Sequence, residues 1–439
     1  MKEEFLHYVW KYQLYNTSKL IDPEGTAVEI IDPGIYNRDS GPDFFNARIR
    51  IDGTEWAGNV EIHTRSSLFE THGHNRDHAY DNVILHVVAV KDREVYNASG
   101  KKVLTVVIEV DESVSKRYST LVNNSYVIAC QDDIGNIDRF LVSHWLHSLL
   151  VERLIRKTGF IEHILAETGY DWEETFYRLL SRYFGFRVNT EPFEMLAAAI
   201  PFSIIRKHAD NRFQIEALLF GTAGMLDEGL FRDAVNDQYY KDLIKEYKIL
   251  SAKYSLKPIH GWLWKFSKLR PGNFPTIRIS QLAGMLSIAG GLFSQALEAA
   301  DLKNLRYLFD VSATEYWNTH YIFGKPSKSM RKSTGETAID ILLINSVIPA
   351  IFAYGRIRDN RFLSEKAMIF LEGITPEANT VISEWNKAGI EASSAFESQA
   401  LLQLRNEYCR KRRCLDCRIG ATLIARRVKL KKDQDLNLF

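Results

Sequence analysis

The hydrophobic pattern of the chain changes character near residue 112. Before that point, short apolar runs alternate with turn residues, which is typical of strands, and one amphipathic helix opens the chain. The apolar run VILHVVAV is suited to a buried strand. The expected elements, in chain order, are a helix over 3–15, three strands within 27–63, a helix or helical loop over 66–82, and strands over 83–90 and 101–110.

Beyond residue 112 the strand pattern largely disappears and apolar residues recur with helical spacing. Helices are expected over 138–157, 171–184, 212–226, 276–297, 338–356, 361–372 and 378–407. We therefore predict three parts: an α/β domain over 1–112, a connection over 113–136, and a mainly α-helical domain with a C-terminal cysteine-rich and basic segment over 137–439.

Length and composition agree with a soluble protein of several domains. The 439 residues are too many for one ordinary core, and 46% hydrophobic with 25% charged content is usual for globular proteins. The first fifteen residues carry charges throughout and resemble no signal peptide, and the longest apolar runs are too short to span a bilayer. Four cysteines in so long a chain argue against a disulfide scaffold. We expect a cytoplasmic protein with no membrane partner.

Two acidic residues stand where neighbouring strands are expected to meet. Asp43 follows Gly41-Pro42 at the start of one strand, and Glu61 lies near the end of the next strand, eighteen residues later. In a hairpin of that length the two acids can face each other, and alternation places Glu61 and His63 on one face. Two carboxylates that converge in this way can hold a divalent metal ion, although Asp43 could simply end a turn and Glu61 could be solvated.

The pattern Pro42-Asp43 followed by Glu61-Ile62-His63 resembles the signature of the PD-(D/E)XK nucleases, whose restriction-endonuclease-like core has the order αβββαβ. The resemblance implies that Asp43 and Glu61 bind Mg²⁺ or Mn²⁺, and that a glutamate of the first helix, for which we choose Glu3, completes the site. His63 replaces the usual lysine. Histidine titrates near pH 6.5 and binds softer metals, so the activity or the metal could differ from those of the nucleases.

Histidines gather immediately after the second acid. His72, His74 and His78 follow closely in THGHNRDH, and His86 lies on the next predicted strand. Such a group beside Glu61 could bind Zn²⁺ or Mn²⁺, or supply a general acid. Side chains of the second helix often support catalysis in the resembling nucleases, which makes His74 and Asp77 candidates. Each histidine taken alone also fits a turn, a surface or a core position.

The C-terminal segment combines cysteines with basic residues. Cys409, Cys414 and Cys417 have metal-ligand spacing, and Cys130 could be a fourth ligand for Zn²⁺ or an iron–sulfur cluster. The alternative is a set of reduced thiols beside a helix. The candidate phosphate contacts in this segment and in the loop RPGNFPTIR are Arg410, Lys411, Arg412, Arg413, Arg270 and Arg278.

The whole chain is similar to a bacterial family of uncharacterised proteins known only as a domain of unknown function. The segments that carry this similarity are EEFLHYVW, SGPDFFNARI, WAGNVEIHTRSS, HGHNRDHAYDNVILHVV, RPGNFPTIRISQLA and CRKRRCLDC. Leu68-Phe69 stands where the family has an Asp-Trp pair, which casts doubt on a role for that position.

Three functions compete on these observations. The first is a metal-dependent nuclease acting on DNA or RNA, with Asp43 and Glu61 holding the ion and His63 positioning or deprotonating water. The second is a nucleic-acid-binding or scaffold protein that has lost catalysis. The third is a Zn²⁺- or Mn²⁺-dependent hydrolase of a non-nucleic substrate, which would lack a basic surface near the site. The sequence does not determine the oligomeric state.

Overall fold

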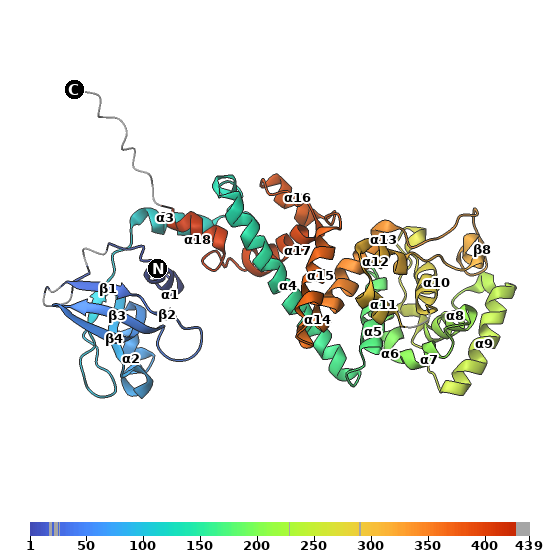
Figure 1. The fold of residues 1–439 in the computed structure, drawn as a ribbon, viewed down its shortest axis with the longest axis horizontal. Helices are drawn as coiled ribbons and strands as arrows, with labels where there is room; N and C mark the ends of the chain where they lie inside the picture. The colour runs from blue at the N-terminus through green and yellow to red at the C-terminus, as the bar shows by residue number, and fades with distance from the viewer. Residues whose placement is uncertain (17–19, 22–24, 26, 228, 289–290, 427–439) are drawn as a thin grey trace, which may run out of the picture. The chain divides into compact units, whose positions relative to one another are not determined.

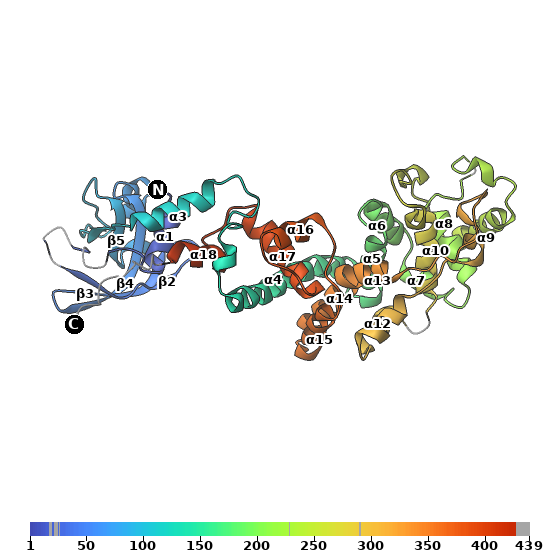
Figure 2. The same ribbon diagram turned by 90° about the horizontal axis from the view of Figure 1, so that it is seen from above.

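The computed structural model describes residues 1–16, 20–21, 25, 27–227, 229–288 and 291–426 (Figures 1 and 2). The chain divides into two compact units. Unit 1 contains Met1–Trp145, Lys387–Ile390 and the segment from Leu404 onward, and unit 2 contains Leu146–Asn386 and Glu391–Gln403. The cysteine-rich segment, which was expected at the end of the helical domain, therefore belongs to the same compact unit as the N-terminal sheet.

Unit 1 is built around a mixed sheet with the strand order β1-β3-β4-β5-β6, in which β2 also pairs with β3. The first three long strands run antiparallel, whereas β4, β5 and β6 run parallel to one another. The elements of this unit are α1 (Glu3–Lys11), β1 (Val28–Asp32), β2 (Ile35–Tyr36), β3 (Phe44–Ile51), β4 (Thr54–Arg65), α2 (Leu68–Thr71), β5 (Val83–Val90), β6 (Thr105–Val107), α3 (Glu112–Asn123) and α18 (Arg418–Ala425).

The expected mixed α/β region is confirmed, with local differences. The helix or helical loop expected over 66–82 is one turn of α-helix, α2, followed by two 3₁₀ turns. This segment is rich in histidine, aspartate and asparagine, which favour turns over helices. The predicted connection over 113–136 contains the helix α3, which Asp111 caps by accepting a hydrogen bond from the Ser113 N–H.

Helix α1 packs on the sheet through a continuous apolar face. Its side chains Phe5, Leu6, Val9 and Trp10 are almost fully buried, and the helix contacts β4. The Trp10 indole N–H donates to the backbone oxygen of Pro33 at 3.0 Å. Because α1 has only 9 residues, this burial and not intrinsic helix propensity holds it in place.

Unit 2 is mainly helical, as predicted. Its longest helix, α4, begins in unit 1 and continues in unit 2 (Figure 2). Neighbouring helices such as α5 with α6, α8 with α9, and α14 with α15 pack against each other. The elements are α4 (Arg139–Glu167), α5 (Trp172–Phe184), α6 (Thr190–Ala199), α7 (Phe202–Arg206), α8 (Arg212–Thr222), α9 (Gln238–Tyr254), α10 (Pro275–Leu286), α11 (Leu292–Glu298), α12 (Leu302–Phe309), β7 (His320–Ile322), β8 (Lys325–Pro326), α13 (Glu336–Leu342), α14 (Ile348–Ile357), α15 (Arg361–Glu372), α16 (Thr380–Lys387) and α17 (Ala395–Gln403).

Several long predicted helices are interrupted. The helix expected over 276–297 is divided into α10 and α11, and the one expected over 378–407 into α16, α17 and a π-helical turn. Gly389, which lies between α16 and α17, has a φ of +92°, a conformation that favours glycine and ends a helix. Helical spacing alone does not reveal such breaks.

One helical stretch, Glu336–Ile357, is long and apolar enough to cross a membrane. Most of its apolar window is buried inside the structure (83%). This burial is what a core helix of a soluble protein shows, because its apolar surface is already covered by neighbouring helices.

The packing of α1 gives a first prediction. Leu6→Ala should lower the free energy of unfolding of unit 1 by about 2 to 5 kcal/mol, because it leaves a cavity at a fully buried position. Hydrogen exchange of the amides in β4 measures this loss. The control Lys11→Ala, at an exposed position of the same helix, should change it by less than about 0.5 kcal/mol. Equal effects of the two changes would contradict the packing described here.

Candidate functional site

The register between β3 and β4 brings the two predicted acids together. Phe44 pairs with Val60 in antiparallel register, so the preceding Asp43 lies beside the following Glu61. The Asp43 backbone N–H donates to Glu61 Oε2 at 3.2 Å, and the Ile62 N–H donates to Asp43 Oδ2 at 2.8 Å. The backbone of each strand thus helps to orient the carboxylate that comes from the other strand.

His63 lies two residues beyond Glu61 and is the centre of a chain of imidazoles. Its Nδ1 is 2.9 Å from Nε2 of His86 on β5, and its Nε2 is 3.1 Å from Nδ1 of His72. The Thr105 hydroxyl donates to the backbone oxygen of Val103 and lies 3.5 Å from His86 Nδ1. The Thr105 oxygen can therefore accept a hydrogen bond from His86 Nδ1–H. If His86 carries its proton on Nδ1, its Nε2 accepts from His63, and the proton of His63 is then assigned to Nδ1. This assignment leaves the lone pair of His63 Nε2 facing the site.

The His63 ring is held in its neutral form. Burial, followed by the neighbouring imidazoles of His86, His74 and His72, lowers the pKa of His63 to about 2. Burial likewise lowers the pKa of His86 to about 3. A neutral imidazole, here with its Nε2 lone pair directed toward His72 Nδ1, is the form that binds metal ions.

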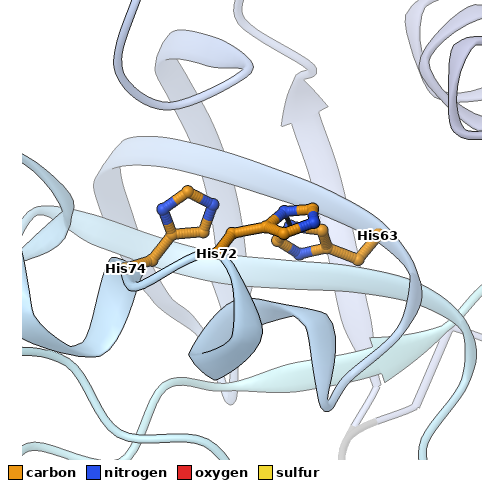
Figure 3. Close-up of side chains that lie close together, drawn as sticks. All are labelled: His63, His72 and His74. Atoms are coloured by element: carbon orange, nitrogen blue, oxygen red, sulfur yellow. Dashed lines mark hydrogen bonds between the residues drawn. The ribbon is translucent and has the colours of Figure 1, made fainter.

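His72 and His74 come from the turn that follows α2 (Figure 3). The glycine between them, Gly73, has a φ of +82°, which allows the chain to turn so that both rings approach His63. One nitrogen of each of the three rings lies within 4.8 Å of the other two. Among the described residues, this is the group of three or more potential ligands that meets that spacing.

Glu61 completes the arrangement. Its Oε1 lies 3.1 Å from His74 Nε2 and 3.6 Å from His63 Nε2. Burial raises the pKa of Glu61, the hydrogen bond with His74 opposes that rise, and the charge of Asp43 adds to it. Three imidazole nitrogens therefore lie close together, with a carboxylate oxygen beside two of them, and this is a donor set typical of transition-metal sites.

Two aromatic rings pack against the histidines of the site. Tyr80 stacks on His74 with ring centroids 3.9 Å apart, and the fully buried Phe69 contacts the rings of His63, His74 and His86. Phe69 belongs to the Leu68-Phe69 pair that follows the two serines. Its place in the structure is a packing position that fixes the orientation of the rings.

Helix α1 contributes two side chains that lie one turn apart. His7 Nε2 lies 3.3 Å from Asp43 Oδ2, and Tyr36 contacts the other ring nitrogen of His7. Burial alone would lower the pKa of His7, but the carboxylates of Asp43, Glu3 and Glu61 raise it overall. Burial also raises the pKa of Glu3, which interacts electrostatically with His7, Asp43, His72 and His74. Glu3 therefore lies near the site.

His7 also lines a cavity of about 530 Å³ within unit 1. The lining is basic and aromatic, with six Lys and Arg side chains against two carboxylates. The cavity residues are Lys2, Glu4, His7, Tyr8, Lys11, Tyr12, Tyr36, Arg38, Tyr118, Val122, Lys411, Arg412, Arg413, Leu415 and Asp416. An anionic ligand in this cavity would therefore lie next to the His7–Asp43 pair.

Some predicted site residues lie elsewhere. The Asp77 carboxylate accepts from the Ala79 N–H at the start of a 3₁₀ turn and is exposed, so it has a local structural role. Arg278, expected to contact phosphate, is buried in unit 2 and donates to Asn273 and Gln281. Its guanidinium is thus already occupied within the protein. Arg270 is exposed in unit 2, and Arg410 is exposed but does not line the cavity.

His7 was not found by sequence reasoning, and the signal for it was weak. Glu3 and His7 are four residues apart on the predicted first helix, so they share a face. That spacing gains meaning only when α1 packs beside Asp43. The sequence showed His72 as a possible metal ligand because it belongs to the group of closely spaced histidines. Its approach to His63, however, depends on the turn at Gly73.

These features define a two-unit protein whose mixed α/β unit holds a histidine–carboxylate cluster, in which His63 and Glu61 are buried and His72 is exposed. Comparison with family models matches residues 3–380 to the family described as a protein of unknown function, DUF2851, and the chain belongs to that family. The chain matches none of the curated proteins and none of the solved structures.

The neutral histidines give a prediction for acid stability. Because the folded-state pKa values of His63 and His86 lie below the ordinary 6.5, their contribution is present above pH 6.5 and is lost as pH falls toward 3 and 2. At pH 5 the metal-free protein should lose about 2 kcal/mol of stability for each of these histidines. Hydrogen exchange in β4 and β5 at pH 7 and pH 5 measures this loss.

His86→Gln should reduce the dependence of folding stability on pH. His78→Gln, at an exposed position, should leave the loss of stability between pH 7 and pH 5 unchanged. Equal pH dependence in His86→Gln and the unaltered protein would show that His86 is not held neutral by burial.

Proposed function

We propose that the protein is a metal-dependent hydrolase of nucleic-acid phosphodiesters and that unit 1 is a restriction-endonuclease-like core. The observation that carries the proposal is the convergence of Glu61, His63, His72 and His74 beside a basic, aromatic cavity. Metal ligands and a surface suited to phosphate are thus found in one unit.

The order of elements supports the proposed core. A helix is followed by three antiparallel strands, a helical crossover and a strand that returns parallel to β4. With the two-residue strand β2 set aside, this order agrees with αβββαβ. Asp43 immediately precedes β3, and Glu61 lies on β4. Fold similarity alone does not establish chemistry, so the proposal depends on the site.

The donor set favours Mn²⁺ or Zn²⁺ over Mg²⁺. Mg²⁺ prefers oxygen ligands, whereas imidazole suits transition metals. His63, His72 and His74 would each hold the ion through one ring nitrogen, and the nearby Oε1 of Glu61 would add a carboxylate ligand. When bound, such an ion activates water and neutralises charge on a phosphate. Asp43 lies beside this group, and its carboxylate is directed to His7 and the Ile62 N–H.

His7 is the side chain best placed to move a proton. It pairs with Asp43, lines the cavity and has a raised pKa, so a larger fraction carries a proton near neutral pH. In hydrolysis a water oxygen bonds to phosphorus while the bond to the leaving sugar oxygen breaks. In this proposal His7 donates its proton to that leaving oxygen, and Asp43 stabilises the protonated ring. The attacking water releases one proton to the solvent, and His7 regains a proton from the solvent.

The cavity supplies the means of binding the substrate. Lys11, Arg38 and Lys411 can contact backbone phosphates, and tyrosines such as Tyr12 and Tyr36 offer faces on which bases stack. This lining favours DNA or RNA over a non-nucleic substrate. The same lining would also suit a protein that binds nucleic acid without cleaving it, and activity measurements distinguish these two functions.

The cysteines form no disulfides among the described residues, which supports a reducing, cytoplasmic location.

The proposal predicts metal-dependent cleavage that requires the cluster. The full-length protein should cleave labelled single- or double-stranded DNA or RNA with Mn²⁺ or Zn²⁺ present. His74→Asn and Glu61→Gln should each lower the rate by about 100-fold or more, because transition-state stabilisation by a metal amounts to several kcal/mol. The matched control is His78→Asn, which changes an exposed histidine four residues after His74.

His78→Asn should retain full activity. If the unaltered protein cleaves none of these substrates under any of the metals, the catalytic proposal fails. Tight nucleic-acid binding without cleavage would then favour the binding role.

The cavity predicts salt-dependent binding. In Arg38→Ala and Lys411→Ala, the slope of log K against log salt for single-stranded DNA should fall by about 0.7 for each phosphate that the variant no longer neutralises. Fluorescence anisotropy over a range of salt concentrations measures this slope. Lys101→Ala, an exposed change in unit 1 outside the cavity, serves as the control and should leave the slope unchanged. Equal slopes in all variants would exclude the cavity as the binding surface.

A further inference from the structure

All four cysteines of the chain gather in one buried place in unit 1. Cys130 lies far from the other three in sequence, yet each of the four is at least about nine-tenths buried. Hydrogen bonds between the segments that carry them, through Arg412 and Asn124, bring Cys130 near the other three. Isolated structural cysteines have no reason to collect in this way, because a buried thiol behaves as a small apolar group that packs anywhere in a core.

Specific contacts tie the two cysteine-bearing segments together. The Arg412 guanidinium donates to the backbone oxygen of Asn124 at 2.8 Å, and the Asn124 side-chain amide donates to the Ala129 oxygen at 2.6 Å. Arg412 thus links the loop between Cys409 and Cys414 to the segment that ends at Cys130. Arg412 itself adopts a φ of +53°, a strained conformation that this link helps to stabilise.

Three N–H groups partly offset the cost of a negative charge on the buried sulfur of Cys417. Burial raises the pKa of Cys417, and the backbone N–H groups of Ile419 and Gly420, at the first turn of α18, oppose that rise. The indole N–H of Trp145 acts in the same direction, and this buried group has no hydrogen-bond partner among the described residues. Gly420 permits this arrangement, because a Cβ there would lie 2.3 Å from the Cys414 backbone oxygen.

We propose that Cys130, Cys409, Cys414 and Cys417 ligate an iron–sulfur cluster. Thiolates are the usual ligands of such clusters and also of Zn²⁺. With Zn–S bonds of about 2.3 Å, four sulfurs around one Zn²⁺ would lie roughly 4 Å apart. No three of the four described sulfurs lie within 4.8 Å of one another, and a cluster of several iron atoms separates its ligands more widely.

Binding requires four thiolates, so the four thiols release their protons as the iron and sulfide enter. Burial raises the pKa of Cys130 to about 12 and that of Cys414 to about 11 in the metal-free protein. The positive charge of the iron would offset this cost.

The cluster would also hold the basic loop in place. Lys411, Arg412 and Arg413 lie between the ligands Cys409 and Cys414 and line the cavity described above. The inferred cluster is therefore a structural centre that fixes part of the basic lining. It does not depend on the proposed hydrolysis, and its presence can be tested without any activity.

The test is the metal content of the full-length protein purified without oxygen. We expect iron and acid-labile sulfide in near-equal amounts, with visible absorbance from iron–thiolate bonds. Cys130→Ser and Cys414→Ser should lose most of this iron and absorbance. Ala129→Ser, which adds a hydroxyl at a neighbouring buried position and keeps every sulfur, should retain them.

Trypsin gives a second readout. Loss of the cluster in Cys414→Ser should increase cleavage after residues 410–413, since the loop would no longer be tied at both ends. Stoichiometric Zn²⁺ in place of iron would overturn the assignment. The inference would also be overturned if the folded protein binds no iron after incubation with iron and sulfide.

Discussion

The antiparallel pairing of Phe44 with Val60 fixes the positions of the groups that make up the candidate site. It sets Asp43 beside Glu61, and the two strands exchange backbone hydrogen bonds with the two carboxylates. A shift of one residue would turn Glu61 and His63 to the other face of the sheet and separate them from the turn that carries His72 and His74. The strand pairing therefore controls the chemistry as well as the fold.

His63 and His86 are held in their neutral form by burial, and this lowers the stability of the folded protein at acid pH. His63 and His86 are buried together, and protonating either ring would place a charge where no water can solvate it. The same burial keeps His63 in the neutral form, whose Nε2 lone pair can bind a metal ion in place of its contact with His72. A structure designed only for stability would fill this space with apolar side chains, so the retained imidazoles point to a function in binding.

Sequence patterns predicted the parts that depend on local order. Alternation placed Glu61 and His63 on one face, and the hairpin length allowed Asp43 to approach them. The patterns did not find His7, because its contact with Asp43 depends on how α1 packs on the sheet. They also gave no sign that Arg278 would be buried, since a basic loop residue and a core arginine look alike without tertiary contacts.

The central claim is that Glu61, His63, His72 and His74 form a metal site. The most direct measurement is anomalous X-ray diffraction from a crystal of the full-length protein soaked with Mn²⁺. Our account predicts an anomalous peak surrounded by these side chains, with His63 Nε2 and Glu61 Oε1 among the ligands. The absence of a peak there at saturating Mn²⁺, or a peak bound only by other residues, would contradict it.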